Sequence, residues 1–368
     1  MADRVLILGG RGRIGSSVAA DLIQYTDAHI TITGRSEDAT GKSDLSSDRT
    51  DFLALNLSDD ALLKQAIAQS NLVVHCAGPF HYRDGTVLDR CIDQRVNYLD
   101  VSDNAGFTQR ALSRNAAAAK MGVTAIVNSG IFPGISNSMV RHGVEQLDDP
   151  EQIHLSYVVS GSGGAGITVM RTTFLGLLQP FNAWLEGSWQ KVKPYSDRQP
   201  IQLPDPYGKV HVYWFEMPET FTLAESFPVK TVVTKFGSVP DFYNHLTWIA
   251  AHVFPKSWIR SKRGTEFLAQ VSFRMTNVTD RVSGIGVGIR SEVTGKKDGQ
   301  PAAYVSTLVH DNTAIAAGNG TGSIAQLLLS GQLHKPGVWA VEQALTTELF
   351  EQTMQSRNIQ IHHDWVQF

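Results

Sequence analysis

The sequence predicts an α/β protein in which an N-terminal, doubly wound parallel sheet of the Rossmann type is followed by a second α+β domain with a mixed or antiparallel sheet. Three observations predict this. Short apolar strands alternate with helical segments over residues 1–150, a glycine-rich turn joins the first strand to the first helix, and further strand-like runs recur between residues 202 and 308. A chain of 368 residues is long enough for two domains, expected at 1–150 and 151–368. The C-terminal helices are expected to pack back on the first domain.

The first domain is predicted from apolar periodicity. Runs of period two predict strands at 4–9, 29–33, 52–57, 71–77, 97–101 and 124–128, and runs of period 3.6 predict helices at 13–25, 62–68, 84–95 and 105–121, the last closed by Gly122. Strands that alternate with helices in this way form parallel sheets with right-handed crossovers and with both faces covered. Six strands of this kind predict a nucleotide-binding sheet.

The second domain is patterned less clearly. We expect strands at 152–159, 202–214, 230–234, 271–273, 287–293 and 303–308, helices at 168–191, 321–329 and 339–354, and a strand or tail at 360–363. The glycine-rich run at 160–166 predicts a hinge or mobile loop, with an anion-binding nest as the alternative.

Composition excludes several classes of protein. The net charge of −3 offers no basic excess for a nucleic-acid backbone, and the apolar runs are too short for an integral membrane segment. Two cysteines cannot form a disulfide framework, and the N-terminal residues show no secretory signal, so a cytoplasmic protein is expected. No metal site is expected, because His362, His363 and Asp364 are adjacent on an extended segment and point to alternate sides.

The first turn of the sheet carries the clearest motif. Gly10, Gly12 and Gly15 follow a strand and open a helix, with Arg11, Arg13 and Ile14 between them. In a dinucleotide site the first glycine permits the tight turn, the second lets the backbone approach the pyrophosphate, and the third lets the helix press on the strand. We therefore expect these six residues to bind a dinucleotide, with its pyrophosphate at the helix N-terminus.

The end of the second strand predicts which dinucleotide. Sites for NAD usually carry an acidic residue there, but this strand ends with Arg35 and Ser36, which suit a 2′-phosphate. The cofactor predicted is therefore NADP. Other residues that follow strand ends are expected on the same rim: Asn56, Leu57, Cys76, Ala77, Gly78, Pro79 and Phe80.

These motifs resemble the saccharopine dehydrogenase-like family of NAD(P)-binding oxidoreductases. The resemblance rests on the glycine turn, on residues 33–36, 75–80, 97–102 and 130–137, and on Gly337 to Glu342 near the C-terminus. It covers residues 1–145 and the C-terminal end and is poor from about 165 to 300. It implies reversible hydride transfer between a nicotinamide and a C–N bond, and it does not imply a substrate.

The resulting prediction is an NADP(H)-dependent oxidoreductase acting on the C=N or C–N bond of a small or bulky apolar substrate, with a homodimer as one candidate assembly. The alternatives are a C=C (enoyl-type) reductase and a non-catalytic NADP(H)-binding sensor or scaffold. Tyr82 and Asp103 are the candidate catalytic proton donors, because both follow strands that border the expected nicotinamide site. Sixteen of the 32 aromatic residues lie between Phe181 and Trp258, which predicts either an apolar substrate pocket or a domain core or subunit interface.

Overall fold

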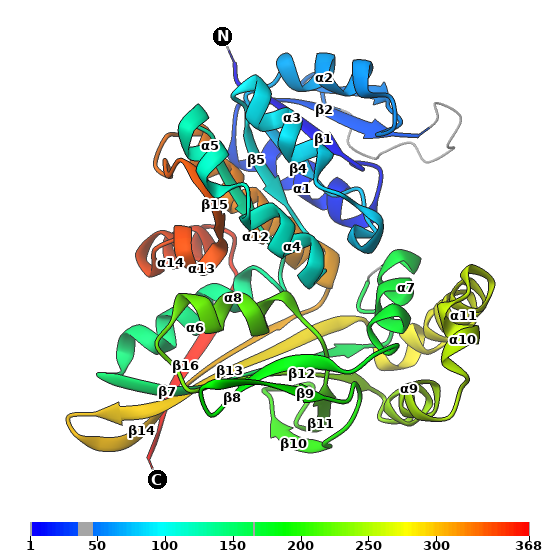
Figure 1. Ribbon diagram of the computed structural model, residues 1–368, viewed down its shortest axis with the longest axis vertical. Coiled ribbons are helices and arrows are strands. Elements are labelled where there is room, and N and C mark those ends of the chain that lie inside the picture. Colours follow the sequence, from blue (N-terminus) through cyan, green and yellow to red (C-terminus); the bar gives the residue numbers. More distant parts are fainter. Residues whose placement is uncertain (1, 36–46, 165, 368) are drawn as a thin grey trace. The chain divides into compact units, whose positions relative to one another are not determined.

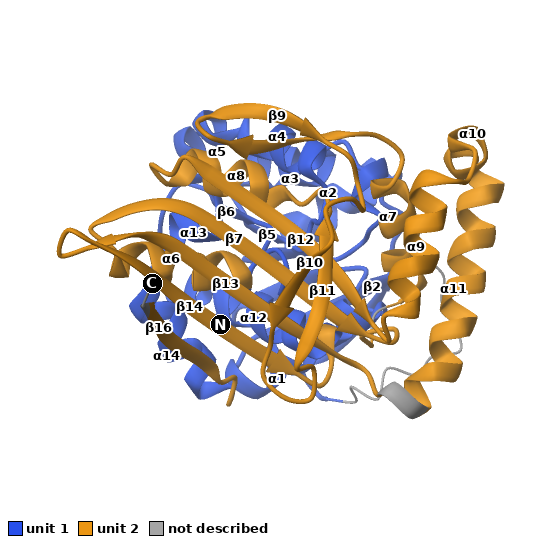
Figure 2. Cartoon of the chain, turned by 90° about the horizontal axis from the view of Figure 1, so that it is seen from below, with its two compact units in different colours: residues 1–135, 314–357 blue, residues 136–313, 358–368 orange. Residues whose placement is uncertain are grey.

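The computed structural model describes residues 2–35, 47–164 and 166–367 (Figure 1). The chain divides into two compact units (Figure 2): unit 1 holds residues 1–135 and 314–357, and unit 2 holds residues 136–313 and 358–368. The C-terminal helices thus return to the unit that the N-terminal residues begin. The assignment of cofactor binding to 1–150 and of substrate binding or dimerisation to 151–368 stays a prediction.

Unit 1 contains a parallel sheet of seven strands in the order β15-β6-β5-β4-β1-β2-β3. The strands are β1 (Arg4–Leu8), β2 (His29–Gly34), β3 (Thr50–Ala54), β4 (Leu72–His75), β5 (Asn97–Asp100), β6 (Thr124–Val127) and β15 (Gly337–Ala340). The predicted Rossmann-type sheet is confirmed. Six of its strands were expected, and the seventh comes from the C-terminal part of the chain.

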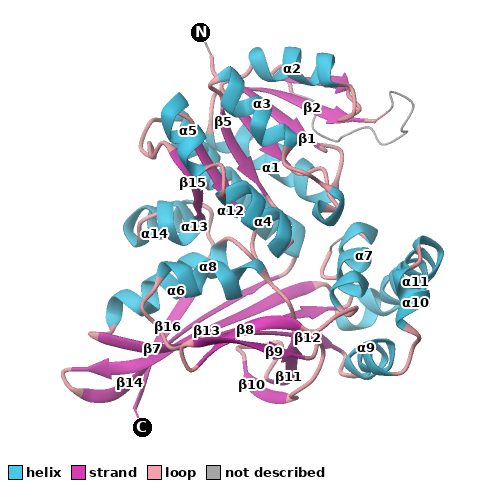
Figure 3. Cartoon of the chain, in the orientation of Figure 1, coloured by secondary structure: helices cyan, strands magenta, loops and turns pink. Residues whose placement is uncertain are grey.

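Helices cover both faces of this sheet (Figure 3). They are α1 (Arg13–Tyr25), α2 (Asp60–Ala68), α3 (Thr86–Gln94), α4 (Ala105–Leu112), α5 (Asn115–Met121), α12 (Thr313–Leu329), α13 (Val341–Ala344) and α14 (Thr347–Ser356), with a 3₁₀ turn, η1 (Phe80–Tyr82). The apolar side chains of α2, α3, α4 and α5 form one buried cluster with alternate strand residues such as Leu6, Val73 and Tyr98. The intervening strand residues, such as Val5, Ile7 and Val74, are buried on the opposite face.

Helix α1 is held against α12 by very close packing. A Cβ atom on Gly318 would lie 2.5 Å from Cβ of Ser17, and one on Gly322 would lie 2.0 Å from Oδ1 of Asp21. Only glycine fits at these two positions of α12, because any side chain there would overlap α1.

A buried ion pair completes this contact. Arg357, just beyond α14, donates from Nε and Nη2 to the two carboxylate oxygens of Asp21 at 2.7 and 2.8 Å, and neither side chain is exposed. The guanidinium also lies 4.2 Å from the centre of the Tyr25 ring and donates to Gln326. Burial raises the pKa of Asp21, and the hydrogen bonds from Arg357 oppose that rise.

Unit 2 contains a mixed sheet of nine strands, which confirms the second α+β element of the prediction. Its main path runs β10-β11-β12-β7-β13-β14-β16, and β8 and β9 form a hairpin beside β12. Among the described strands of this sheet, only β12 and β7 pair in parallel. The strands are β7 (Asp149–Ser160), β8 (Phe181–Leu185), β9 (Ser188–Val192), β10 (Gln199–Gln202), β11 (Lys209–Trp214), β12 (Thr231–Val239), β13 (Gly286–Lys297), β14 (Gln300–His310) and β16 (Ile361–Gln367).

The helices of unit 2 are α6 (Ile135–Gln146), α7 (Ile167–Gly176), α8 (Pro218–Ser226), α9 (Phe242–His252), α10 (Lys256–Arg260) and α11 (Lys262–Ser283). Within the described residues, no helix combines the length and the apolar composition needed to cross a bilayer.

Three expectations for these elements are wrong. The helix expected at 168–191 ends at Gly176, and the hairpin β8–β9 follows, because Glu186 and Gly187 both adopt positive φ angles that form a tight turn. The strand expected at 271–273 lies inside α11. The helix expected at 339–354 is instead strand β15 followed by α13 and α14, with the Thr346 side chain capping α14.

A carboxylate of unit 2 binds Ser162 within residues 160–164, a described part of the glycine-rich run. Asp280 accepts hydrogen bonds from the backbone nitrogen of Ser162 at 2.7 Å and from its hydroxyl at 2.5 Å. Gly161 and Gly163 adopt positive φ angles, and a Cβ on Gly161 would lie 2.1 Å from Asp280. The backbone nitrogens from Gly161 to Gly164 all donate to acceptors of the chain, and that of Ser162 donates to the Asp280 carboxylate.

The buried ion pair predicts a large stability effect. Arg357→Met should lower the free energy of unfolding by about 3–5 kcal/mol, because it leaves the Asp21 carboxylate buried without its partner. Thermal denaturation followed by circular dichroism measures the change. The control is Arg90→Met, which removes a partly exposed ion pair with Asp60 and should cost far less, because solvent screens that pair. Equal losses of stability in the two variants would contradict the conclusion that burial makes the Asp21–Arg357 pair the more important one.

Candidate functional site

The glycine turn between β1 and α1 has a different role for each glycine. Gly9 adopts a φ of +75°, and a Cβ on Gly10 would lie 2.4 Å from the Ile32 side chain of β2. A Cβ on Gly15 would lie 2.5 Å from the Gly9 carbonyl oxygen, so Gly15 lets α1 press on the turn. A Cβ on Gly12 would meet only that carbonyl oxygen among the described atoms, at 3.2 Å. The backbone of Gly12, at the start of α1, is therefore not covered by other described atoms.

The N-terminus of α1 favours an anion. Its N-cap is Gly12, which supplies no capping side chain, and the first turn contains no acidic residue. The first amides of a helix have no acceptor within the helix and carry partial positive charge. Arg13 and Ile14 begin the helix here, so the predicted pyrophosphate contacts from Gly10 to Gly15 all lie in one turn of backbone.

Cationic side chains gather beyond the carboxyl end of β2. The guanidinium of Arg11 lies 3.6 Å from the centre of the Phe52 ring, and its Cδ would be 3.1 Å from a Cβ on Gly34. Arg35 follows β2 and is exposed. Arg35 also lowers the pKa of Arg83, after the larger effect of burial. The predicted contact Ser36 lies outside the described residues.

The loop after β4 is packed directly against the glycine turn. A Cβ on Gly9 would lie 2.9 Å from the Ala77 backbone, and the Ala77 carbonyl accepts a 2.9 Å hydrogen bond from Nε of Arg83. Cys76, Ala77, Gly78 and Pro79 thus lie in a loop that the turn and Arg83 fix from two sides. Burial raises the pKa of the Cys76 thiol, which keeps it protonated at neutral pH.

Three of the predicted rim residues have structural contacts. Phe80 is buried, and its ring packs edge-on against His75 and Phe107. Leu57 is partly buried against the same core. Asn56 lies beyond β3, where its Oδ1 accepts from the Ser58 nitrogen. The structure therefore places Phe80 in the core of unit 1 and leaves Asn56 beside the strand end.

The two candidate proton donors lie in different surroundings. Tyr82 ends the turn η1 and is 63% exposed, with its ring edge-on to His81. Asp103 is half-buried before α4, and it is the next residue, Asn104, whose side chain caps that helix. Their catalytic roles stay predictions.

A buried carboxyl that the sequence analysis did not single out fixes the neighbouring loops. Oδ1 of Asp100, at the end of β5, accepts from the backbone nitrogens of Ser102 and Asn128, both at 3.0 Å. The Ser129 hydroxyl donates to the Asp100 carbonyl, and Asn128 donates to the Ser102 carbonyl. One residue thereby holds the loops after β5 and β6. An acidic residue inside an otherwise apolar strand, Tyr98-Leu99-Asp100-Val101, was the signal available in the sequence.

The Asp100 carboxyl is part of a buried polar chain. The Tyr98 hydroxyl lies 3.1 Å from Nδ1 of His75, and it also interacts with the Asp100 carboxyl. Burial raises the pKa of Asp100 to about 6, although the two backbone hydrogen bonds oppose the rise. Burial lowers the pKa of His75 to about 3, so this imidazole is neutral at physiological pH. This series of buried polar side chains is suited to hold the ends of β4, β5 and β6 in place.

In unit 2 the aromatic residues between Phe181 and Trp258 do not form one group. Tyr157, Tyr195, Tyr213, Phe215 and Phe236 stack or pack edge-on with one another. Trp214 is buried nearby, 5.4 Å from the ammonium of Lys235, which is itself buried and paired with Asp197 at 2.7 Å. Trp189, Trp248 and Trp258 are exposed.

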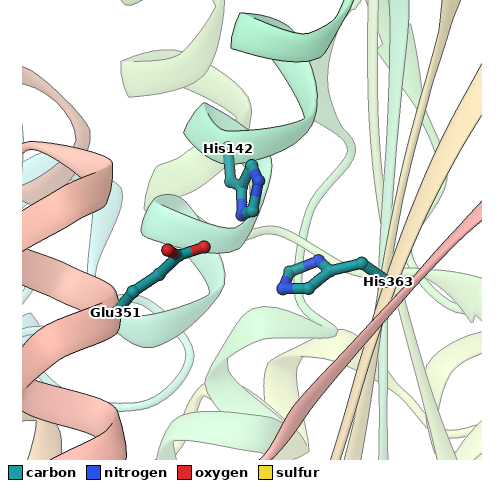
Figure 4. A group of neighbouring side chains, drawn as sticks. All are labelled: His142, Glu351 and His363. Carbon is teal, nitrogen blue, oxygen red and sulfur yellow. The ribbon is translucent and has the colours of Figure 1, made fainter.

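Two imidazoles of unit 2 face one another. The rings of His142 in α6 and His363 in β16 have centroids 4.4 Å apart (Figure 4). Nδ1 of His363 is 2.9 Å from the Ser306 hydroxyl, and Nε2 of His142 is 3.4 Å from the Tyr304 hydroxyl.

Comparison with known proteins agrees with this geometry. Residues 5–126 match the family model for the saccharopine dehydrogenase NADP binding domain. The resemblance to the saccharopine dehydrogenase-like family is confirmed. Carboxynorspermidine synthase of Vibrio cholerae is 24% identical over 392 aligned residues, which cover 94% of each chain. A saccharopine dehydrogenase-like oxidoreductase of Rattus norvegicus is 23% identical over 162 residues, which cover 44% of this chain and 37% of that one.

Solved structures share the fold. The homospermidine synthase of Legionella pneumophila in complex with NAD superposes with a TM-score of 0.67 at 11% identity, covering 100% of this chain and 92% of that one. The chain is therefore an enzyme, and its residues 5–126 are similar to the NADP binding domain of saccharopine dehydrogenase. The alternative of a non-catalytic scaffold is set aside, because the relatives are oxidoreductases or synthases.

The open backbone at Gly12 predicts a selective loss of cofactor binding. Gly12→Val should weaken NADPH binding at least about tenfold while circular dichroism and melting temperature stay close to wild type, because the side chain enters space that the described part of the chain leaves open. Calorimetric titration measures the affinity. Gly10→Val is the structural control, since its side chain would overlap Ile32 and should destabilise the fold. Normal NADPH binding by Gly12→Val would place the phosphate cradle elsewhere.

The raised pKa of Asp100 predicts a pH-dependent stability. Its folded-state pKa of about 6 exceeds the ordinary value of 3.8, so the folded state holds the proton more tightly than the unfolded state. The contribution of Asp100 should therefore decrease by roughly 3 kcal/mol as pH rises from about 4 to about 7. Urea denaturation at several pH values should show wild type losing stability relative to Asp100→Asn over this range.

Asp60 provides a control of opposite sign for that experiment. Hydrogen bonds from Lys64 and Arg90 lower the pKa of this exposed carboxyl. Wild type should therefore gain stability relative to Asp60→Asn as pH rises to about 4, and the difference should stay nearly constant from about 4 to about 7. A pH-independent difference between wild type and Asp100→Asn would show that Asp100 titrates normally.

Proposed function

We propose that this enzyme is an NADP(H)-dependent oxidoreductase that transfers hydride to or from a carbon–nitrogen bond of a small-molecule substrate. The observation that supports NADP is the group of arginines at the carboxyl end of β2. Arg35 follows the strand, Arg11 lies over Phe52 beside Gly34, and Arg83 is close enough to Arg35 for its pKa to be lowered. Three like charges at one strand end are favourable when an anion neutralises them.

The residues present fit the group that the family implies. Gly12 leaves its backbone open at the uncapped start of α1, where a pyrophosphate would be bound by helix amides. Arg35 would hold the 2′-phosphate, with Ser36 as a further donor. The loop from Cys76 to Pro79 would line the nicotinamide ribose, because ligands of such sheets bind beyond the carboxyl ends of the strands. When bound, the dinucleotide supplies the hydride.

The proposed substrate class rests on the relative that aligns over most of the chain. Carboxynorspermidine synthase of Vibrio cholerae is named for a secondary amine, whose formation makes a carbon–nitrogen bond, and the alignment covers 94% of each chain. The reaction proposed joins a primary amine and an aldehyde with loss of water and then reduces the resulting C=N bond. Reduction uses one hydride from NADPH and one proton from solvent or a protein acid.

Two side chains are proposed to deliver that proton. Tyr82 is exposed on the loop after β4, and Asp103 lies on the loop after β5 that Asp100 fixes.

The proposal of NADP as the cofactor predicts that a substitution of Arg35 will reverse the preference for NADPH over NADH. Wild type should bind NADPH at least about tenfold more tightly than NADH, because a charge-assisted hydrogen bond contributes about 1.5–3 kcal/mol. Arg35→Asp should erase or reverse the difference. Arg4→Asp, with the same charge change at the amino end of β1, is the matched control and should leave both affinities unchanged. Equal NADPH and NADH affinities in wild type would refute the assignment.

The reaction class is tested by NADPH oxidation with paired substrates. Consumption of NADPH should require both a primary amine and an aldehyde, and the product should be their secondary amine. Tyr82→Phe and Asp103→Asn identify the proton donor by changing the pH dependence of turnover rather than NADPH affinity. Turnover of an enoyl substrate without any amine would favour C=C reduction instead.

A further inference from the structure

One end of unit 2 carries an exposed apolar surface that neither cofactor nor substrate binding accounts for. On α9 and its C-cap, Phe242, Leu246, Ile249 and Val253 follow one another at spacings of four, three and four residues, which places them on one face of the helix. Their side chains are between 38% and 63% exposed. An amphipathic helix of a globular protein normally buries such a stripe.

The neighbouring helix α11 also carries an exposed apolar stripe. On α11, Phe267, Val271 and Val278 lie on one face and are between 38% and 71% exposed. Figures 1 and 2 both show α9, α10 and α11 grouped at one end of unit 2, and the Tyr243 hydroxyl of α9 lies 2.6 Å from the Thr279 hydroxyl of α11. Trp248 and Trp258 add two exposed indoles. We call the exposed apolar residues of 242–278 the helical face.

Positive charge is concentrated on α10 and α11, whereas α9 carries no Lys or Arg and has Asp241 at its N-cap. Residues 242–285 contain six Lys or Arg and two Asp or Glu, a net charge of +4 in a chain whose overall charge is −3. Both acids are engaged inside unit 2. Glu266 forms two hydrogen bonds with Arg171, which lower its pKa to about 2, and Asp280 binds the Ser162 loop. Arg260, Lys262, Arg263, Arg274 and Arg281 are exposed.

This charge argues against a second copy of the chain as the occupant. A two-fold dimer through the helical face would bring two surfaces of charge +4 together, and like charges across an interface disfavour association. An anionic surface has the complementary charge. Tryptophan and phenylalanine interleaved with lysine and arginine are typical of helices that lie in the boundary region of a phospholipid bilayer.

We propose that the helical face binds the surface of an anionic phospholipid bilayer. Phe242, Leu246, Ile249 and Val253 of α9 and Phe267 of α11 insert among the lipid headgroups, and Arg260, Lys262 and Arg263 contact their phosphates. The interaction is peripheral and reversible, since it depends on a few inserted side chains and on electrostatic attraction. It is independent of the proposed oxidoreductase activity.

The test is sedimentation of the full chain with vesicles. One vesicle is phosphatidylcholine alone, and in the other about a third of the lipid is phosphatidylglycerol. We expect at least about tenfold tighter binding to the anionic vesicle, a blue shift of tryptophan emission on binding, and loss of most binding in high salt. Failure to sediment with the anionic vesicle would overturn the proposal.

A double variant tests whether the helical face itself enters the bilayer. Leu246→Glu with Ile249→Glu should reduce vesicle binding at least about tenfold and leave circular dichroism and NADPH affinity unchanged, because both side chains are exposed. Trp189→Glu, equally exposed but on β9, is the matched control and should bind vesicles as wild type does. Unchanged binding by the double variant would overturn the proposal. So would sedimentation velocity that shows a stable dimer which the double variant abolishes, because the face would then be covered by a second copy.

Discussion

The position of helix α1 is the constraint on which the candidate site depends. Its N-terminus forms one wall of the glycine turn, its first turn presses on the Gly9 carbonyl through Gly15, and its flank is fixed by Gly318 and Gly322 of α12. The buried pair between Asp21 and Arg357 fixes its far end. The proposed phosphate site therefore depends on an ion pair whose partners lie 336 positions apart in the chain, and a shift of α1 would alter every backbone group proposed to face the cofactor.

The sequence predicted unit 1 well because its signals are local. The apolar runs identified six of the seven strands, and α1, α2 and α3 begin and end within two residues of their expected bounds. Strand β15 was missed because Trp339 and Val341 also fit a helical pattern, and only pairing with β6 decides between the two. In unit 2 the apolar residues from Met170 to Leu185 fit a helix over their first half alone, since Pro180 and the Glu186-Gly187 turn redirect the chain into a hairpin.

The residues of the candidate site also divide into those that the sequence could identify and those that it could not. The glycine motif and Arg35 could be identified from spacing, because their chemistry depends on neighbours in the chain. Asp100 and Arg83 could not, because their partners come from elsewhere: Asp100 accepts from Asn128 on the next strand, and Arg83 donates to Ala77 beneath the glycine turn. The exposed stripe of α9 is visible as periodicity in the sequence, yet periodicity alone predicts a buried face, and only the structure shows that no described residue of unit 2 covers it.

The return of residues 314–357 to unit 1 has a consequence for synthesis on the ribosome. Strand β6 ends at Val127, but its parallel neighbour β15 begins at Gly337, so the β6 edge lacks this partner while roughly two hundred further residues are made. At about 5–20 residues per second this interval lasts on the order of ten to forty seconds. An unpaired strand edge can pair with other chains during that time. The nascent protein is thus most exposed to aggregation before β15 emerges, and chaperone binding to the β6 edge would have its greatest effect then.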